Sequence, residues 1–230
     1  MFTPTRRRGF EHLDNPDTTP ALRERSLRDV RRANGVLGGA NAVLTEVRRL
    51  LPQLGGSATL LDVGTGLADI PVRARRLAAR MGVQLYTLGL DEAASLAALS
   101  NDVLDGSICG DARKLPFATG SIDVVTCSQV LHHFEDREIS VVLREMNRVA
   151  RHAVIVSDLR RSWFAVGGFW IVTWLLGFHP VSRHDGMVSV LRGFTSHDLS
   201  EHVLRSTGRM ATIRRHLGYR LTATWSPSHE

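Results

Sequence analysis

Lysine is almost absent from this chain of 230 residues, and Lys114 is the only one. The 29 cationic side chains are therefore nearly all arginine, against 23 acidic ones, and the formal net charge is +6. Such a charge is compatible with nucleic acid, an anionic membrane or an acidic ligand as the partner. The arginines are scattered, however, and dense only at residues 6–8 and 23–32. We therefore do not expect nucleic acid to be the partner.

Cysteine is scarce too, with only Cys109 and Cys127 in the chain. Each lies inside an apolar run, where a reduced thiol behaves as a small hydrophobic side chain. No signal peptide is visible, so we expect free thiols and a cytoplasmic location, with a membrane-peripheral location as the alternative.

Long apolar runs are also lacking, because a comfortable membrane span needs ~20 residues. The most apolar stretch, residues 163–178, has no charge and holds three tryptophans and three phenylalanines. Its Gly167-Gly168 pair would weaken a helix. Three interpretations stay open: a core helix, a lid over an apolar substrate pocket, or a peripheral membrane contact flanked by Arg160, Arg161 and Arg183.

The chain divides into a leader and one domain. Residues 1–19 are rich in Thr, Pro, Asp and Arg, and we expect a flexible leader there. Residues 20–230 are predicted to form a single domain, with a helical cap over 20–56, a core over 57–158, a lid and substrate region over 159–195, and a final helix with strands over 196–230. The Gly38-Gly39 pair is expected to break the helical pattern of the cap.

Short apolar runs alternate with helical patterns in the core. Strands are predicted at residues 59–63, 84–90, 103–109, 122–126 and 153–157, with helices at 69–81, 139–149 and 196–206. This alternation predicts an α/β fold with a doubly wound, mostly parallel sheet. The last run, residues 219–225, is predicted to be an antiparallel strand near the end of the sheet.

A glycine-rich turn follows the first predicted strand, in LLDVGTGLADIPVRARRLAAR at residues 60–80. Gly64-Thr65-Gly66 permits a tight turn and the close approach of a ligand to the backbone amides of the following helix. Ala68 stands at the third position of the usual glycine pattern. Dinucleotide-binding folds use the same geometry, so this turn does not by itself distinguish cofactor classes.

An acid ends the next predicted strand, in LYTLGLDEA. Asp91 can accept hydrogen bonds from two ribose hydroxyls, and we expect Glu92 to belong to the same cofactor site. Both nicotinamide and nucleoside cofactors would use such an acid.

The segment CGDARKLPFATGSIDVVTCSQVLHHF, residues 109–134, distinguishes the cofactor classes. Together with the two preceding motifs, over about residues 58–160, it resembles the class I S-adenosylmethionine-dependent methyltransferases, especially those of ubiquinone and menaquinone biosynthesis. The resemblance implies a seven-stranded Rossmann-like sheet with S-adenosylmethionine as cofactor. It places Asp111 at the adenine amino group, Ala112 beside the ring, and Cys127 and Ser128 near the methionine part. Asp62 and the glycine turn would shape the methionine side.

Two other classes stay open. A short-chain dehydrogenase needs a Tyr and a Lys four residues apart, and Tyr86, Tyr219 and Lys114 cannot form that pair. A non-catalytic protein of the same fold would bind the cofactor without turnover, or not at all.

Histidines are the candidate bases for methyl transfer, because the pKa of imidazole lies in the useful range. His132 and His133 follow the fourth predicted strand, and His184 stands beside Asp185. We predict His133 and His184 as catalytic residues, with no metal ion involved. Oxygen is the first choice of methyl acceptor, carbon on a quinol-like ring the second and nitrogen the third.

The acceptor is predicted to be small and largely apolar. In the wider family, helices flanking the core close over the active site, and the corresponding segments here are residues 28–39 and 163–189. Residues 182–199 resemble small methyltransferases that accompany bacterial polyketide enzymes, which suggests an aromatic or polyketide-like metabolite. We expect Asn34, Trp163, Phe164, Trp170 and His184 to line the substrate pocket, in a monomer or homodimer.

Overall fold

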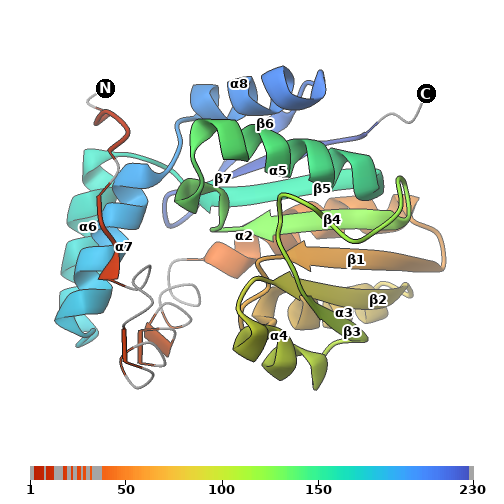
Figure 1. Cartoon of the computed structure of the whole chain (residues 1–230), viewed down its shortest axis with the longest axis horizontal. Helices are drawn as coiled ribbons and strands as arrows, with labels where there is room; N and C mark the ends of the chain where they lie inside the picture. The colour runs from red at the N-terminus through yellow and green to blue at the C-terminus, as the bar shows by residue number, and fades with distance from the viewer. Residues whose placement is uncertain are drawn as a thin grey trace.

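The computed structural model describes residues 3–7, 9–12, 18–19, 22, 25–26, 28–29, 32 and 38–227. Within them, helices flank a seven-stranded sheet (Figure 1). The strands are β1 (Ser57–Val63), β2 (Gln84–Asp91), β3 (Gly106–Cys109), β4 (Ile122–Ser128), β5 (Ala150–Leu159), β6 (Thr212–His216) and β7 (Arg220–Trp225). The helices are α2 (Gly39–Leu50), α3 (Asp69–Arg80), α4 (Ala94–Asn101), α5 (Asp136–Val149), α6 (Trp163–Leu175), α7 (Pro180–Arg192) and α8 (Ser196–Thr207), with short 3-10 turns η2 (Leu51–Gln53) and η3 (Leu131–His133).

The strand order is β3-β2-β1-β4-β5-β7-β6. The first five strands are parallel, whereas β7 is antiparallel to both β5 and β6. The predicted doubly wound, mostly parallel sheet with an antiparallel strand near its end is therefore confirmed. The order reverses between β1 and β4, and sheets of this kind bind ligands at the carboxyl ends of the strands at that point.

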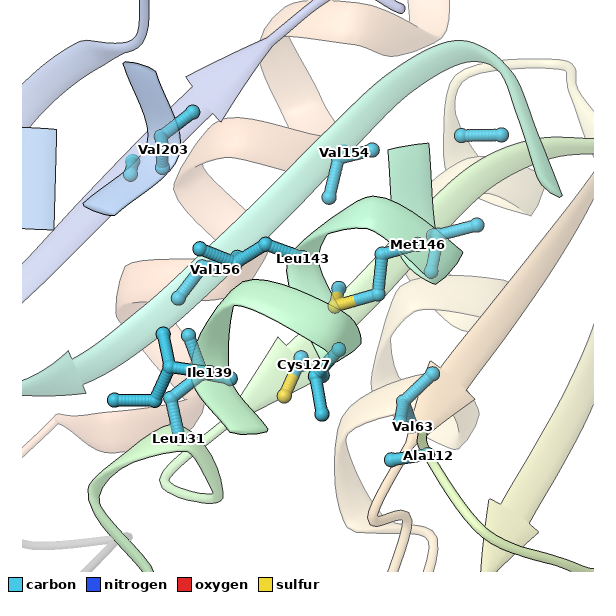
Figure 2. Close-up of a cluster of buried hydrophobic side chains, with 14 of the residues drawn as sticks. Val63, Ala112, Cys127, Leu131, Ile139, Leu143, Met146, Val154, Val156 and Val203 are labelled. Atoms are coloured by element: carbon cyan, nitrogen blue, oxygen red, sulfur yellow. The ribbon is translucent and has the colours of Figure 1, made fainter. Parts of the chain in front are cut away.

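Apolar side chains cover both faces of the central strands. On one face the core joins these strands to α5 and α8, through Leu143, Met146 and Val203 among others (Figure 2). On the other face α2 and α3 pack through residues such as Val43 and Ala74. Burial of a large aliphatic side chain contributes roughly 1.5–3 kcal/mol. The two clusters together fix the register that brings the strand ends to one edge.

Most element boundaries agree with the pattern of the sequence. The break at Gly38 is confirmed: its φ of +74° puts it in the left-handed region, immediately before α2 begins. The strand predicted from residue 103 begins only at Gly106, because the Val103 and Leu104 amides donate to the carbonyl of Ser100 and continue the turn that ends α4.

The polar stretch at residues 182–189 lies within helix α7, which the sequence pattern did not predict. Pro180 occupies the first turn, and the His179 side chain accepts a hydrogen bond from the Val181 amide. Its buried polar residues have partners in the N-terminal segment: Asp185 accepts from the His12 amide at 2.9 Å, and Ser182 bonds to Ser26. These tertiary partners explain why a helix with so little apolar periodicity forms here.

Helix α6 lies at the edge of the molecule and packs against α7 (Figure 1). Only Ala165 and Thr173 of its thirteen residues are buried. The interpretation of this segment as a core helix is therefore wrong, because most of its large side chains are exposed. None of the helices in the described part of the chain has the length and apolar character that a bilayer crossing requires.

The described part of the predicted leader contacts α7 and the residues just before α6. The Arg6 side chain donates to the Arg192 carbonyl at 2.8 Å, and Arg161 donates to the carbonyl of Pro4 at 2.8 Å. Residues 3–7 and 9–12 therefore differ from the flexible leader predicted from composition. Composition could not reveal this docking, because its partners lie more than 150 residues away in the sequence.

Candidate functional site

The glycine turn joins β1 to α3 at the point where the strand order reverses. Gly64 and Gly66 have φ angles of +72° and +53°, in the left-handed region. The Gly64 and Thr65 amides donate to the Leu90 carbonyl at 2.7 and 3.0 Å, which ties this turn to the end of β2. Ala68 also has a positive φ, of 58°, immediately before α3. It thus takes the conformation that a third glycine would favour, as its place in the motif predicted.

Asp91 ends β2 and faces this turn. Its Oδ2 accepts from the Gly66 amide at 2.9 Å, and its Oδ1 accepts from the Ala93 amide at 3.0 Å. The carboxylate is partly exposed and each oxygen keeps a lone pair for a further donor. Glu92 beside it is exposed to solvent.

Asp62 lies buried in β1, opposite Thr126 of β4. Thr126 donates its hydroxyl to Asp62 Oδ1 at 2.6 Å. Burial raises the pKa of Asp62 to about 7, and the negative charges of Asp69 and Asp91 add to that rise, against the lowering effect of the Thr126 hydrogen bond. The sequence predicted Asp62 at the site, but not that burial would raise its pKa.

Asp111 follows β3 and is paired with Arg113. The Arg113 Nε lies 2.9 Å from Asp111 Oδ1, and its Nη1 lies 2.6 Å from Glu138 of α5. The hydrogen bond from Arg113 holds the pKa of Asp111 below its ordinary value. Ala112 is buried and belongs to the same apolar cluster as Val63 (Figure 2). The sequence did not single out Arg113 or Glu138.

Cys127 and Ser128 end β4, but only one of them can offer a side chain to a ligand. The Cys127 thiol is fully buried in the apolar cluster beneath α5, together with Leu143 and Met146 (Figure 2). The predicted cofactor contact at Cys127 would therefore have to come from its backbone. The hydroxyl of Ser128 is buried and has no hydrogen-bond partner among the described residues.

A buried histidine and carboxylate pair joins η3, which follows β4, to the last residues of β5. His132 Nδ1 is 2.7 Å from Asp158 Oδ1, and both side chains are almost completely buried. Burial raises the pKa of Asp158, but the charge and hydrogen bond of His132 act in the opposite direction. Their effect is the stronger, so the pKa of Asp158 lies below its ordinary value. Asp158 escaped the sequence analysis, although an acid at the end of the predicted strand 153–157 was a usable signal.

The two predicted bases are His133, which lies in η3 near Arg192 of α7, and His184, which lies on α7 itself. His133 is partly exposed, and its ring lies 4.2 Å from that of His132. Glu11 from the N-terminal segment is 4.0 Å from His133 Nδ1, and Arg192 of α7 is 3.0 Å from Glu11 Oε1. Glu11 and Arg192 were both missed, because neither stands in a motif and their contact joins opposite ends of the chain.

His184 lies on α7 and contacts its neighbour as predicted, with Nδ1 3.1 Å from Asp185 Oδ1. His12 packs against it at 5.0 Å between ring centroids. The sequence also placed Asn34 in the substrate pocket, and that residue lies outside the described residues.

Among the described residues, two clusters each hold three potential metal ligands whose ligand atoms lie within 4.8 Å of one another. The first consists of Glu11, His132 and His133, and the second of His12, His184 and Asp185. In the first, the Arg192 guanidinium bonds to Glu11 and lies 3.5 Å from His133 Nδ1. A cation therefore already balances that carboxylate, which favours a hydrogen-bonding role over metal binding at that cluster.

A largely apolar cavity of about 250 Å³ lies between α6, α7 and the end of β5. Its lining includes Leu159, Ala165, Phe169, Val172 and Val190. Trp163, Phe164 and Trp170, which the sequence placed in the substrate pocket, do not line it and are exposed on α6. The face of α6 that packs inward carries Ala165 and Phe169 instead, so the three side chains would contact an acceptor only outside this cavity.

Residues 61–156 match the family described as "Methyltransferase domain". They span the glycine turn, Asp91, Asp111 and the ends of β4 and β5, which are the features of the cofactor side described above. These residues form a methyltransferase domain.

Relatives of this methyltransferase domain agree with that assignment. A demethylmenaquinone methyltransferase of Thermotoga maritima is 31% identical over 125 residues, which are 50% of this chain and 52% of the relative. The chain thus spans about half the length of the curated relative it matches.

Two solved methyltransferase structures show the same fold over nearly the whole chain. Magnesium protoporphyrin IX methyltransferase of Synechocystis, with bound SAH (S-adenosylhomocysteine), has a TM-score of 0.58 at 13% identity and covers 94% of this chain and 91% of that one. The plantazolicin methyltransferase, also with SAH, has a TM-score of 0.67 at 11% identity and covers 92% of each chain. The predicted family resemblance and the predicted Rossmann-like fold are confirmed.

The residues of the methyltransferase domain fit S-adenosylmethionine, the predicted cofactor. Asp91 keeps lone pairs for a ribose diol, and the ionised Asp111 keeps lone pairs for an amino group. The buried Ser128 hydroxyl, which has no partner among the described residues, can bond to a polar ligand at the end of β4.

We expect the stability of the methyltransferase domain to depend on the protonation of Asp62. Because its folded pKa, about 7, lies above its ordinary 3.8, the folded state is favoured while the carboxyl is protonated and loses stability as pH rises between these values. Asp62→Asn should remove that loss. Urea unfolding at about pH 5 and about pH 8 should show the variant gaining on the wild type at the higher pH.

The exposed Asp102→Asn serves as the charge-matched control for this measurement. It should leave the difference between the two pH values as it is in the wild type. A wild type and an Asp62→Asn variant with parallel pH dependences would show that Asp62 does not titrate in this way.

Proposed function

We propose that this chain transfers the methyl group of S-adenosylmethionine to an oxygen atom of a small, largely apolar acceptor. The cofactor would lie across the carboxyl ends of β1, β2 and β4, between the glycine turn, Asp91 and Asp111. The single observation that carries the proposal is the position of Asp91, whose two oxygens are held by the Gly66 and Ala93 amides beside the turn. That arrangement fixes a carboxylate where a ribose diol can bind.

The sulfonium methyl group is already strongly electrophilic, so the protein must chiefly orient the acceptor and exclude water. In the transfer, the carbon–sulfur bond breaks as the acceptor oxygen bonds to the methyl carbon, and S-adenosylhomocysteine leaves. The proton of a phenol or enol would pass to a base, which we assign to His133, with His184 as the alternative. Asp158 orients His132, against which the ring of His133 packs.

The acceptor would enter from the lid side of the domain. The cavity beneath α6 and α7 suits an aromatic or polyketide-like metabolite, because its lining is mainly aliphatic and aromatic, with Arg220 as the charged residue that also lines it. A second candidate is carbon methylation of a quinol-like ring. It is favoured by the 31% identity to a demethylmenaquinone methyltransferase over half the chain.

Calorimetric titration with S-adenosylhomocysteine tests the proposed cofactor, with NADH titrated alongside. We expect saturable binding of S-adenosylhomocysteine alone. Binding of NADH alone would favour a nicotinamide-dependent enzyme, and binding of neither would favour a non-catalytic protein of this fold. Radioactive methyl transfer to a panel of phenols, quinols and carboxylic acids then distinguishes oxygen from carbon acceptors.

Asp91→Ala is expected to weaken S-adenosylhomocysteine binding by roughly 1–3 kcal/mol, because it removes the acceptor of the ribose hydroxyls. The same titration measures the loss. Asp102→Ala removes an exposed acid at the end of α4 and should bind as the wild type does, which separates a local contact from a change in net charge. Unchanged affinity in Asp91→Ala would remove this residue from the site.

A further inference from the structure

One face of α6 is a continuous apolar surface. We call it the α6 stripe, and it consists of Trp163, Phe164, Trp170, Ile171, Trp174 and Leu175. Their exposed fractions range from 46% to 72%. Six of the fourteen large hydrophobic side chains exposed in the described part of the chain thus lie on this one helix. Their spacing of three and four residues puts them on the same side.

The stripe faces away from the protein. The opposite side of α6 packs on α7 and buries Ala165 and Thr173, so α6 is already anchored without using the stripe. Gly167 lies between the residues of the stripe in sequence, and a Cβ added there would meet no atom within 4 Å. The surface there is open, and α6 stands at the edge of the molecule (Figure 1).

Positive charge lies at the amino-terminal end of the stripe. A small cavity of about 120 Å³ is lined there by Arg160, Arg161 and Arg215, beside Phe164 of the stripe. Arg161 is bound by Asp198 at 2.8 Å. Arg160 lies over the Tyr219 ring, and Arg215 bonds to the hydroxyl of Ser196. Neither Arg160 nor Arg215 has a carboxylate partner among the described residues, and α6 itself carries no charge.

We propose that the α6 stripe docks the protein on the surface of an anionic phospholipid bilayer. Three tryptophans with Phe, Ile and Leu suit the boundary between headgroups and acyl chains, where indole rings concentrate. Arg160 and Arg215 would meet the phosphate groups, because basic side chains near an anionic surface are attracted to it. At thirteen residues α6 lies in the plane of the surface, because a span needs ~20.

Charge complementarity favours the bilayer over a second copy of this chain. Two copies meeting through the stripe would each bring Arg160 and Arg215 to the contact, and each chain carries a net charge of +6. An anionic surface removes that repulsion.

Membrane docking also gives the apolar cavity a source of acceptor, an extension that rests on the proposed function. The cavity is lined by Ala165, Phe169 and Val172 from the inner side of α6. The helix therefore lies between the bilayer and the cavity, and an apolar acceptor dissolved in the bilayer has a short path to it.

Vesicle cosedimentation of the full chain tests the docking. The vesicles are phosphatidylcholine alone, or phosphatidylcholine mixed with phosphatidylglycerol. We expect binding to the mixed vesicles with a blue shift of tryptophan emission, and weaker binding as salt is raised. The double variant Trp170→Ser, Trp174→Ser should bind at least roughly tenfold more weakly, because two interfacial anchors are gone.

Two controls separate docking from folding. Met210→Ser changes a side chain that is 87% exposed and lies between α8 and β6, away from the stripe, and it should bind vesicles as the wild type does. Titration with S-adenosylhomocysteine should give the same affinity in all variants, so a failure of docking is distinguishable from a failure of the cofactor proposal.

The variant Arg160→Gln, Arg215→Gln should lose the preference for phosphatidylglycerol.

Three results would overturn the proposal. The first is a wild type that binds neither kind of vesicle. The second is full retention of binding in the tryptophan double variant. The third is a dimer in sedimentation velocity that the tryptophan double variant converts to monomer, with no vesicle binding, which would make the stripe a contact between copies.

Discussion

Replacing Gly64 with alanine is expected to destabilise the domain by roughly 2–5 kcal/mol and to abolish cofactor binding. The φ of Gly64 is +72°, a conformation that costs an L-residue about 1–2 kcal/mol. A Cβ built there would lie 2.3 Å from Val130 Cγ2, so a stiff β-branched side chain must move, which adds about 1–3 kcal/mol. Because Val130 lies between β4 and η3, the shift would disturb the strand ends that form the site. Urea unfolding and titration with S-adenosylhomocysteine measure the two effects.

Gly55→Ala isolates the conformational part of this loss. Its φ is also +72°, but nothing lies within 4 Å of the added Cβ. It should lose about 1–2 kcal/mol and keep its affinity for the cofactor. Combining Gly64→Ala with Val130→Ala removes the clashing methyl groups and should recover part of the difference. Equal losses in Gly64→Ala and Gly55→Ala would show that the contact with Val130 is of no consequence.

Replacing His132 with leucine is expected to destabilise the domain by about 3–5 kcal/mol at neutral pH, because Asp158 would be left as an unpaired buried charge. His132 is the 2.7 Å partner of this fully buried carboxylate. Replacing both residues with leucine should cost much less than the single change, since a buried pair can be exchanged for apolar side chains with little loss. Urea unfolding of both single variants and the double variant gives the coupling energy.

The pH dependence gives an independent check on the same pair. The pKa of Asp158 is lowered in the folded protein, so the pair stabilises the fold above the ordinary carboxyl pKa, and this contribution disappears as pH falls through the folded value. In the His132→Leu variant the burial effect is opposed only by the hydrogen bond from the Leu159 amide and the charge of His133, so the pKa of Asp158 should rise. The deficit of the variant should therefore shrink as pH falls from about 7 to about 4. A deficit that is constant over that range would mean that lost packing, not the buried charge, explains it.

Helix α6 shows that the same apolar composition is compatible with opposite interpretations. Residues 163–178 were equally compatible with a core helix and a surface, because apolar composition does not say which neighbours cover a segment. The structure decides this through α7: its contact with α6 covers only one side, which leaves Trp174 61% exposed. The short β3 shows the same limit, since its apolar run begins before the hydrogen bonds of the α4 turn release the chain.

The acceptor side was harder to foresee than the cofactor side for a physical reason. The glycine turn, Asp91 and Asp111 each stand at or just after the end of a strand of a parallel sheet, so topology alone brings them to one edge. Asp158 stands at an equivalent place, yet nothing in its sequence context shows that His132 is 2.7 Å away. Glu11 and Arg192 are separated by 181 residues and meet only because the N-terminal segment packs along α7.

The sequence by itself determined the alternation of strands and helices, the turn at Gly64, and the acids at or just after the ends of β2 and β3, while its resemblance to the methyltransferases indicated the cofactor class. These features are local, and each follows from hydrophobic period, glycine conformation or position at a strand end. The tertiary structure alone decided that Cys127 belongs to the core, that Asp158 is paired with His132, and that α6 presents its tryptophans outward. Each of these depends on which distant segments pack together, and that is fixed by the burial of the whole chain rather than by any one stretch of it.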